Sequence, residues 1–190
     1  MNTKKRCPWA GNDSIYIDYH DNEWGREVHD DNKLFEMLIL EGAQAGLSWI
    51  TILKKREAYR KAFDRFDPKK VALYSADKVE ELMNNQGIVR NRLKINSAII
   101  NAQAFLKIVD EYGSFDKYIW SYVDYTPIVG HWKSISEVPV TTSISDKISK
   151  DLKKRGFKFV GSTIIYSFMQ AIGMVNDHIT ECFVYKERGK

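Results

Sequence analysis

Two cysteines and two of the four histidines lie in pairs near opposite ends of the sequence. Cys7 and His20 precede the first long hydrophobic segment, and His178 and Cys182 follow the last one. If the second pair is helical, its side chains point the same way, because residues four apart share a helix face. Two thiolates and two imidazoles fill the tetrahedral shell that structural zinc prefers. The pattern therefore predicts one closed zinc site per chain that joins the two ends.

Spacing alone leaves other roles open for these residues. A buried cysteine is often a small hydrophobe, and a Cys7–Cys182 disulfide is possible. The polar N-terminus MNTKKRCPWAG lacks the apolar core of a signal peptide, so we expect a cytoplasmic protein with reduced thiols. A catalytic zinc of a hydrolase is a further alternative, but it keeps an open position beside three protein ligands. His29 and His131 have no cysteine nearby and are expected in surface or loop positions.

Composition and charge narrow the class of protein. The 190 residues suit one domain or two small lobes, and 44% of them are hydrophobic, which is enough for a core. No apolar run approaches the about 20 residues of a membrane span. The net charge of +4 is compatible with a polyanionic partner but does not by itself indicate one. Basic clusters at residues 54–56, 90–94 and 153–158 are ordinary solvated helix ends or a weak sign of nucleic-acid binding.

Hydrophobic periodicity predicts an all-α protein of nine or ten helices. Helix starts are indicated by Asp30 to Asn32, by Asp67-Pro68 and by Ser75, and Ser143 and Ser145 precede an amphipathic stretch that ends at Gly156. Residues 124–142 contain two prolines and a glycine and are predicted to be a loop.

The segment from Leu82 to Lys94 joins two amphipathic helices through a tight turn. Gly87 can take a positive φ and expose backbone N–H groups, which with Arg90, Arg92 and Lys94 would hold a phosphate at the start of the next helix. The segment resembles a helix-hairpin-helix DNA-binding element, although it has one glycine where the usual hairpin has two. An ordinary helix–helix turn is as compatible with the pattern.

Several longer strings resemble DNA-3-methyladenine glycosylase I, the Tag-type family. The resemblance spans Arg6 to Cys182 in matching order, and its strings are CPW at 7–9, YIDYHDNEWG at 16–25, LEGAQAGLSW at 40–49, RGFKFVG at 155–161, SFMQ at 167–170 and VNDH at 175–178. The resemblance implies an all-α helix-hairpin-helix glycosylase fold. It also implies a single unit of two lobes, one formed by the termini with the zinc and the other by the central helices with the hairpin at residues 82–94.

The resemblance implies a reaction as well. A monomeric base-excision repair enzyme would bind double-stranded alkylated DNA and hydrolyse the N-glycosidic bond of 3-methyladenine, releasing the base and leaving an abasic site. Many helix-hairpin-helix glycosylases use an aspartate beyond the hairpin, but Ile95 to Lys107 contain none. No lysine is placed to form a Schiff base, so a monofunctional enzyme is expected. A non-catalytic DNA- or protein-binding module is the main rival.

The resemblance also assigns the base pocket. Trp9, Tyr16, Tyr19 and Trp49 match the family's aromatic pocket, in which ring faces stack on a cationic purine. Without the resemblance, aromatic residues on amphipathic helices are more often core. Glu41 continues the inward helical face after an apolar run, where an unpaired carboxylate is costly. We expect it to accept a hydrogen bond from the exocyclic amine of the base, with a salt-bridged or helix-terminal glutamate as the alternative.

The turn after Glu41 faces the duplex in this family. Gln44, Gly46 and Leu47 are therefore expected to contact DNA, and Leu47 would fill the gap left by the extruded base. A buried position for Leu47 at the start of the next helix is equally compatible with the sequence.

Overall fold

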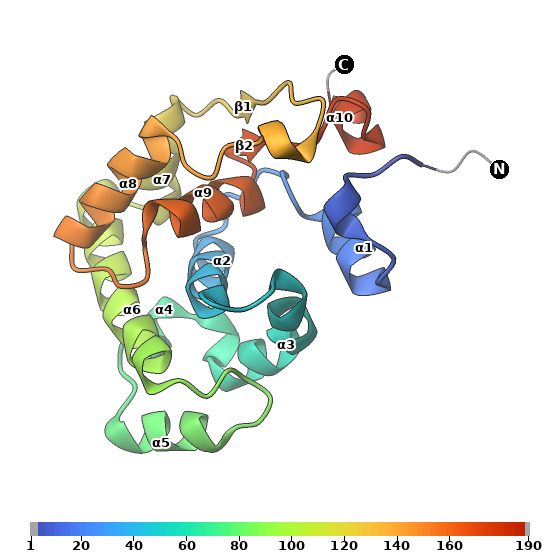
Figure 1. The fold of residues 1–190 in the computed structure, drawn as a ribbon. Coiled ribbons are helices and arrows are strands. Elements are labelled where there is room, and N and C mark those ends of the chain that lie inside the picture. Colours follow the sequence, from blue (N-terminus) through green and yellow to red (C-terminus); the bar gives the residue numbers. More distant parts are fainter. Residues whose placement is uncertain (1–3, 189–190) are drawn as a thin grey trace.

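The fold was determined as a computed structural model that describes residues 4–188 (Figure 1). This part of the chain is mostly helical, as the hydrophobic pattern predicted. The helices are α1 (Ser14–Asn22), α2 (Asp31–Gln44), α3 (Trp49–Ala62), α4 (Pro68–Val71), α5 (Ala76–Asn84), α6 (Arg92–Tyr112), α7 (Phe115–Trp120), α8 (Ser143–Lys154), α9 (Ser162–Ala171) and α10 (Phe183–Arg188). Short 3₁₀ turns lie at Pro8–Ala10, Asp64–Phe66, Ser121–Val123 and Ile135–Glu137.

Helix α2 is the centre of the fold. The Asp30 carboxylate accepts from the backbone N–H of Lys33 at 2.8 Å and caps its start. Every residue from Leu34 to Ala43 is buried, because α3, α6, α7 and α9 pack around this helix (Figure 1). A helix enclosed on all sides holds its C-terminal residues rigidly, which matters because Glu41 lies in its last turn.

Several helix starts agree with the sequence. Asp67 caps α4 with Pro68 in its first turn, and Ser75 caps α5. Helix α8 differs slightly from expectation. Thr142 is its cap, and Ser145 lies inside the helix, where it completes a capping box with the backbone of Thr142.

Residues 124–142 are mostly loop, as predicted, but they contain a short strand. β1 (Ile128–Val129) pairs in parallel with β2 (Val175–Asn176), with Ile128 opposite Val175. The β-branched side chains of both strands suit this pairing. The strand pair fixes the segment that leads into Asp177 and His178.

The predicted hairpin connects α5 to α6, but Gly87 has a different role from the one expected. Its φ is not positive, and its N–H is not free, since it donates to Asn85 Oδ1 at 2.8 Å. A Cβ at this position would lie 2.7 Å from the Cβ of Ala58 in α3. Glycine is therefore required for close packing of the hairpin on α3 rather than for a left-handed turn.

The two ends of the described chain lie on one side of the molecule (Figure 1). The backbone N–H of Phe183, at the start of α10, donates to the carbonyl of Lys5 at 2.8 Å. Among residues 4–188, no helix has the length and apolar character needed to cross a membrane.

Candidate active site and metal centre

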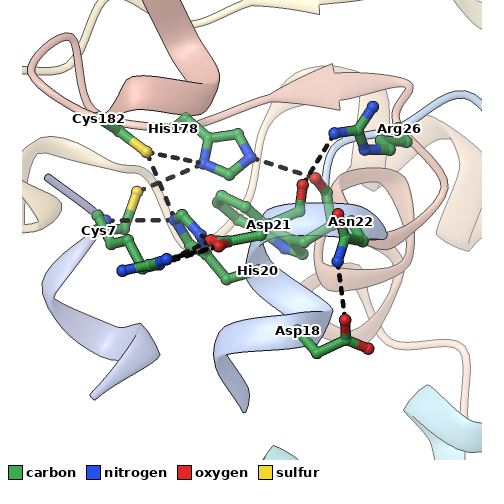
Figure 2. Close-up of polar contacts among 10 residues, drawn as sticks. Cys7, Asp18, His20, Asp21, Asn22, Arg26, His178 and Cys182 are labelled. Atoms are coloured by element: carbon green, nitrogen blue, oxygen red, sulfur yellow. Dashed lines mark hydrogen bonds and ion pairs between the residues drawn. The ribbon is translucent and has the colours of Figure 1, made fainter. Parts of the chain in front are cut away.

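The four cysteine and histidine side chains singled out in the sequence meet in one buried cluster (Figure 2). Their ligand atoms all lie within 4.8 Å of one another. Cys182 Sγ lies 3.5 Å from both His20 Nε2 and His178 Nδ1, and Cys7 Sγ lies 3.5 Å from His178 Nδ1. Metal–ligand bonds of about 2.0–2.3 Å in a tetrahedron place neighbouring ligand atoms about 3.3–3.8 Å apart. The donor types and the spacing therefore fit a tetrahedral metal ion.

The last two candidate ligands reach the cluster by a different route from the one predicted. His178 and Cys182 do not lie on a helix; they belong to the irregular segment between β2 and α10. A turn closed by the bond from Cys182 N to Ile179 O, at 2.8 Å, brings the two side chains together. Cys7 precedes the 3₁₀ turn Pro8–Ala10, and His20 lies near the end of α1.

Outer partners hold both imidazoles in the orientation that a metal needs. His20 Nδ1 contacts Asp21 Oδ1 at 2.7 Å, and the guanidinium of Arg6 forms a two-pronged ion pair with the same carboxylate. His178 Nε2 lies 3.2 Å from the carbonyl oxygen of Trp24. Each ring thus donates from one nitrogen and directs the other at the sulfurs, which is the usual arrangement around metal-bound histidine.

The two thiols share their protons unequally. A hydrogen bond from Cys7 lowers the pKa of Cys182, while the same contact and burial raise the pKa of Cys7. Both cysteines are free and buried. A thiolate already favoured at Cys182 is the form that binds metal, and a bound cation would also deprotonate Cys7.

A cavity of about 130 Å³ lies beside the metal cluster. All four aromatic residues expected to hold the base line it, and so does Glu41; the full lining is Trp9, Tyr16, Tyr19, Trp24, Glu41, Gln44, Trp49, Ser167 and Gln170. The walls come from the N-terminal segment, α1, α2, α3 and α9. Segments that are distant in sequence therefore build one aromatic pocket.

The aromatic walls support one another through ring contacts. Trp9 lies 5.1 Å from Tyr16 and 4.8 Å from Trp24 between ring centroids, and Tyr19 lies 5.5 Å from Trp49. The indole N–H of Trp49 is buried and has no hydrogen-bond partner among the described residues. Rings fixed in this way present faces and edges to a flat ligand. Because the rings are already held in place, they lose little conformational entropy when the ligand binds.

Glu41 is the most unusual group in the pocket. Its side chain is only 4% exposed, and no hydrogen bond or ion pair to its carboxylate occurs among the described residues. Burial raises its pKa from 4.5 to about 8. Burial and the nearby Glu41 also raise the pKa of Tyr16 and of Tyr19. Glu41 does lie in the last turn of α2, but the alternative of a salt-bridged glutamate does not fit, and the carboxylate is available to a ligand.

A second cavity of about 180 Å³ continues from the first. It shares Glu41, Gln44 and Ser167 with the pocket, and Gly46 and Leu47 line its outer part. Leu47 is 41% exposed, so the alternative of a buried core leucine is wrong. Gly46 takes a φ of +79°, which allows the sharp turn after α2 that leaves Leu47 in solvent.

The cations of the hairpin differ in availability. Arg90 is exposed and has no ion pair or hydrogen-bond partner in the described part of the chain. Arg92 is paired with Glu80 through both terminal nitrogens, one of them at 2.9 Å. Lys94 differs most from expectation, because its ammonium donates to the carbonyls of Ala43 at 2.8 Å and Ala45 at 2.6 Å. It caps the C-terminal end of α2, and its burial lowers its pKa.

Comparison with known proteins decides the family. The model of the methyladenine glycosylase family matches residues 9–185. The chain belongs to the methyladenine glycosylase family. A curated relative, DNA-3-methyladenine glycosylase 1 of Escherichia coli (strain K12), is 54% identical, and the alignment covers 95% of this chain and 97% of that protein.

Solved structures of methyladenine glycosylases share the fold. A crystal structure of 3-methyladenine DNA glycosylase I matches with a TM-score of 0.91 at 54% identity, covering 94% of this chain and 98% of that one. A variant of 3-methyladenine DNA glycosylase I crystallised in complex with 3-methyladenine matches with a TM-score of 0.92 at 40% identity, covering 95% of this chain and 97% of that one. The helical architecture described above is therefore the one this family uses.

Three residues of the glycosylase pocket were not predicted from the sequence. Trp24, Ser167 and Gln170 complete its lining. Ser167 and Gln170 are three residues apart on α9, and that spacing places them on one helix face. The available signal was that both residues lie in the string SFMQ, which is one of those that carry the family resemblance.

Proposed function

We propose that this chain is a monofunctional DNA glycosylase of base-excision repair that removes 3-methyladenine from alkylated double-stranded DNA. One observation carries the proposal: an aromatic pocket contains a buried, unpartnered carboxylate at Glu41. The relatives' names support it, because they describe DNA-3-methyladenine glycosylases and a complex with 3-methyladenine. A carboxylate among aromatic faces suits a flat, cationic base that carries an amine.

The chemistry follows from the charge on the methylated base. Methylation at N3 makes the purine cationic, so the base departs as a neutral molecule when the bond between its N9 and the sugar C1′ breaks. The electron pair of that bond stays with the base, positive charge moves to the sugar, and a water molecule adds to C1′ and loses a proton. The leaving group needs little acid catalysis. The protein must instead extrude the base, at a cost of a few kcal/mol, and hold it in position.

The residues of the site divide this work. Trp9, Tyr16, Tyr19 and Trp49 would stack around the extruded base, and Glu41 would accept from its exocyclic amine. Contacts that hold the cationic base equally well before and during bond cleavage improve selection rather than rate. Ionisation of Glu41 on binding the cation therefore serves mainly to choose the damaged base. The sugar cation that develops later is balanced by Glu41 or by the DNA phosphates.

DNA would approach over the second cavity and the hairpin. Gln44, Gly46 and Leu47 line the second cavity, and the exposed Leu47 would enter the space left in the base stack. Arg90 is the hairpin cation available for a phosphate, and Arg92 becomes available if Glu80 releases it. Lys94 would support the site by fixing the end of α2, with Gly87 fitting the hairpin onto α3.

We further propose that the metal is one structural zinc ion per chain, held by Cys7, His20, His178 and Cys182. Two sulfurs and two imidazole nitrogens within 4.8 Å of one another leave no protein-free position for a reactive water, in contrast to a catalytic zinc. Zinc there would cross-link the terminal segments. It would anchor a lobe built from both ends of the chain, with the central helices and the hairpin at residues 82–94 as the second lobe.

Base release is the deciding experiment. The full-length, metal-loaded protein is incubated with methylated double-stranded DNA, and the released bases are separated by chromatography. We expect free 3-methyladenine and DNA that retains intact strands until alkali cleaves the abasic sites. Glu41→Gln is the matched control, because it keeps the shape of the pocket. Release of no base by the wild-type protein would favour a non-catalytic binding module, and direct strand cleavage would contradict a monofunctional enzyme.

A further inference from the structure

A second carboxylate, Asp177, lies directly behind the pocket wall. It is completely buried and accepts three hydrogen bonds, from Trp132 Nε1 at 2.7 Å, Tyr166 Oη at 2.6 Å and Gln170 Nε2 at 2.8 Å. Gly130 makes room for this group, because a Cβ there would lie 2.6 Å from Asp177 Oδ1. Of the three donors, Gln170 alone lines the pocket that also contains Glu41.

The Asp177 carboxylate decides which way the Gln170 amide points. An ionised carboxylate only accepts hydrogen bonds, so it holds the NH₂ group of Gln170 and turns the amide oxygen away. That oxygen has no hydrogen-bond partner among the described residues. It is also not fully buried. Since Gln170 lines the pocket, an amide oxygen turned away from Asp177 can meet a ligand there. The Gln170 backbone is also fixed, because its carbonyl accepts from Gly25 N at 2.9 Å.

We propose that the amide oxygen of Gln170, oriented by Asp177, is a second acceptor for the exocyclic amine of the base and restricts the pocket to purines that carry an amine at C6. This inference rests on the proposed function and concerns its selectivity. Gln170 would touch the base, and Asp177 would be a positioning residue that acts through it.

Chemical complementarity supports two acceptors from two different helices. Glu41 and Gln170 lie on α2 and α9, helices that pack against each other. The amine of adenine has two N–H donors, so one can go to each acceptor. A guanine or hypoxanthine base carries an oxygen at the same position, which would face two acceptors and leave them unpaired. A buried polar group left without a hydrogen-bond partner destabilises the complex by its full desolvation free energy, so the pocket rejects the base with an oxygen at C6.

The sharpest variant reverses the Gln170 amide without changing its size. In Asp177→Asn, the new amide keeps its oxygen toward Trp132 and places its NH₂ toward Gln170. Gln170 then has to accept from it, and its own NH₂ group turns into the pocket. The probes are two free bases that differ at C6, 3-methyladenine with its amine and 3-methylhypoxanthine with its oxygen. Their dissociation constants are measured by calorimetry on the metal-loaded full chain.

We expect the preference for 3-methyladenine over 3-methylhypoxanthine to fall about tenfold in Asp177→Asn, the effect of exchanging one hydrogen-bond acceptor for a donor. Gln170→Ala should reduce the preference as well, and Asp177→Asn should change it no further in that background. Tyr166→Phe is the matched control. It removes another donor to the same Asp177 oxygen without turning the Gln170 amide, so the preference should stay as in the wild type.

If Asp177→Asn weakens the binding of both bases equally, Asp177 has only a structural role and the inference is overturned. If that variant does not fold, Gln170→Ala decides, and an unchanged preference overturns the inference. Release of 3-methyladenine from methylated DNA by the wild type distinguishes failure of the proposed function from failure of the role given to Gln170. If release occurs while the Gln170→Ala preference is unchanged, only the second acceptor is wrong; if release is absent, the proposed function fails and the inference fails with it.

Discussion

The indole of Trp24 packs edge-on against the imidazole of His178, with ring centroids 4.6 Å apart. Trp24 lines the base pocket, and His178 belongs to the cysteine and histidine cluster. Trp9 makes a second bridge, since its ring lies 5.1 Å from that of His20. The wall of the pocket thus rests directly on the side chains that would bind the metal.

Removal of the metal is therefore expected to loosen the pocket as well as the termini. Zinc at a thousandfold excess over its Kd stabilises a folded protein by about 4 kcal/mol, and chelation would remove that contribution. We expect a lower melting temperature, altered tryptophan fluorescence and weaker binding of free 3-methyladenine. Cys182→Ser should reproduce all three changes without chelator. A chelated protein with unchanged fluorescence and base affinity would contradict the link between cluster and pocket.

Glu41 is predicted to reduce stability at alkaline pH. Its pKa rises from 4.5 in the unfolded chain to about 8 in the folded protein. Between pH 4.5 and about 8, the folded protein therefore keeps a proton that the unfolded chain has released. Its stability contribution is complete below pH 4.5 and is lost as the pH rises through about 8. Glu41→Gln should remove this dependence and raise the free energy of unfolding at pH 8 by about 1–3 kcal/mol. Denaturant unfolding from pH 5 to 9 checks this, and a parallel loss in both proteins would contradict it.

The same group should shape the pH dependence of activity in the opposite direction. Base recognition needs the ionised carboxylate, so kcat/KM should rise with pH toward a midpoint near 8. Glu41→Gln should be flat over this range and should release 3-methyladenine about ten- to a hundredfold more slowly, since a charge-assisted hydrogen bond contributes about 1.5–3 kcal/mol. Zinc content and binding to undamaged DNA should be unchanged. A variant with the wild-type rate would leave selection to the aromatic rings alone.

The arginines of the hairpin can be separated by their ion pairs. Arg90→Ala should weaken binding to all DNA sequences alike and lower the salt dependence by about one unit of slope. Arg92→Ala should have a smaller effect, because Glu80 already neutralises that side chain. Glu80→Gln should strengthen DNA binding by freeing Arg92. Fluorescence anisotropy across a salt series measures all three, and a Glu80→Gln variant that binds more weakly would exclude a phosphate role for Arg92.

Lys94 should behave as a structural residue. Its two hydrogen bonds hold carbonyls at the end of α2, so Lys94→Met should lower the free energy of unfolding by about 1–3 kcal/mol. The salt dependence of DNA binding should stay near the wild-type value. A stable variant with a reduced salt slope would restore Lys94 to the phosphate contacts first expected from the sequence.

The sequence was sufficient to predict which of the candidate site residues lie together in space. Cys7, His20, His178 and Cys182 meet in one cluster, the four aromatic residues and Glu41 line one cavity, and local patterns predicted the helices well. It was insufficient where a role depends on a distant backbone. Gly87 is required by Ala58 of another helix, and Lys94 is bound by carbonyls of residues 43 and 45. The orientation of Gln170 depends on Asp177, and no periodicity could have indicated that contact.

The distance in sequence between Cys7 and Cys182 has a consequence during synthesis. A ribosome releases the N-terminal ligands first, and the cluster cannot close until the segment with His178 and Cys182 has emerged. Since Trp9 and Trp24 are buttressed by the histidines of the cluster, a nascent or prematurely ended chain would have an unfinished pocket. Domains generally fold as units during synthesis, and here completion would await the last ligand. A complete base pocket would thus form only in chains translated at least as far as Cys182.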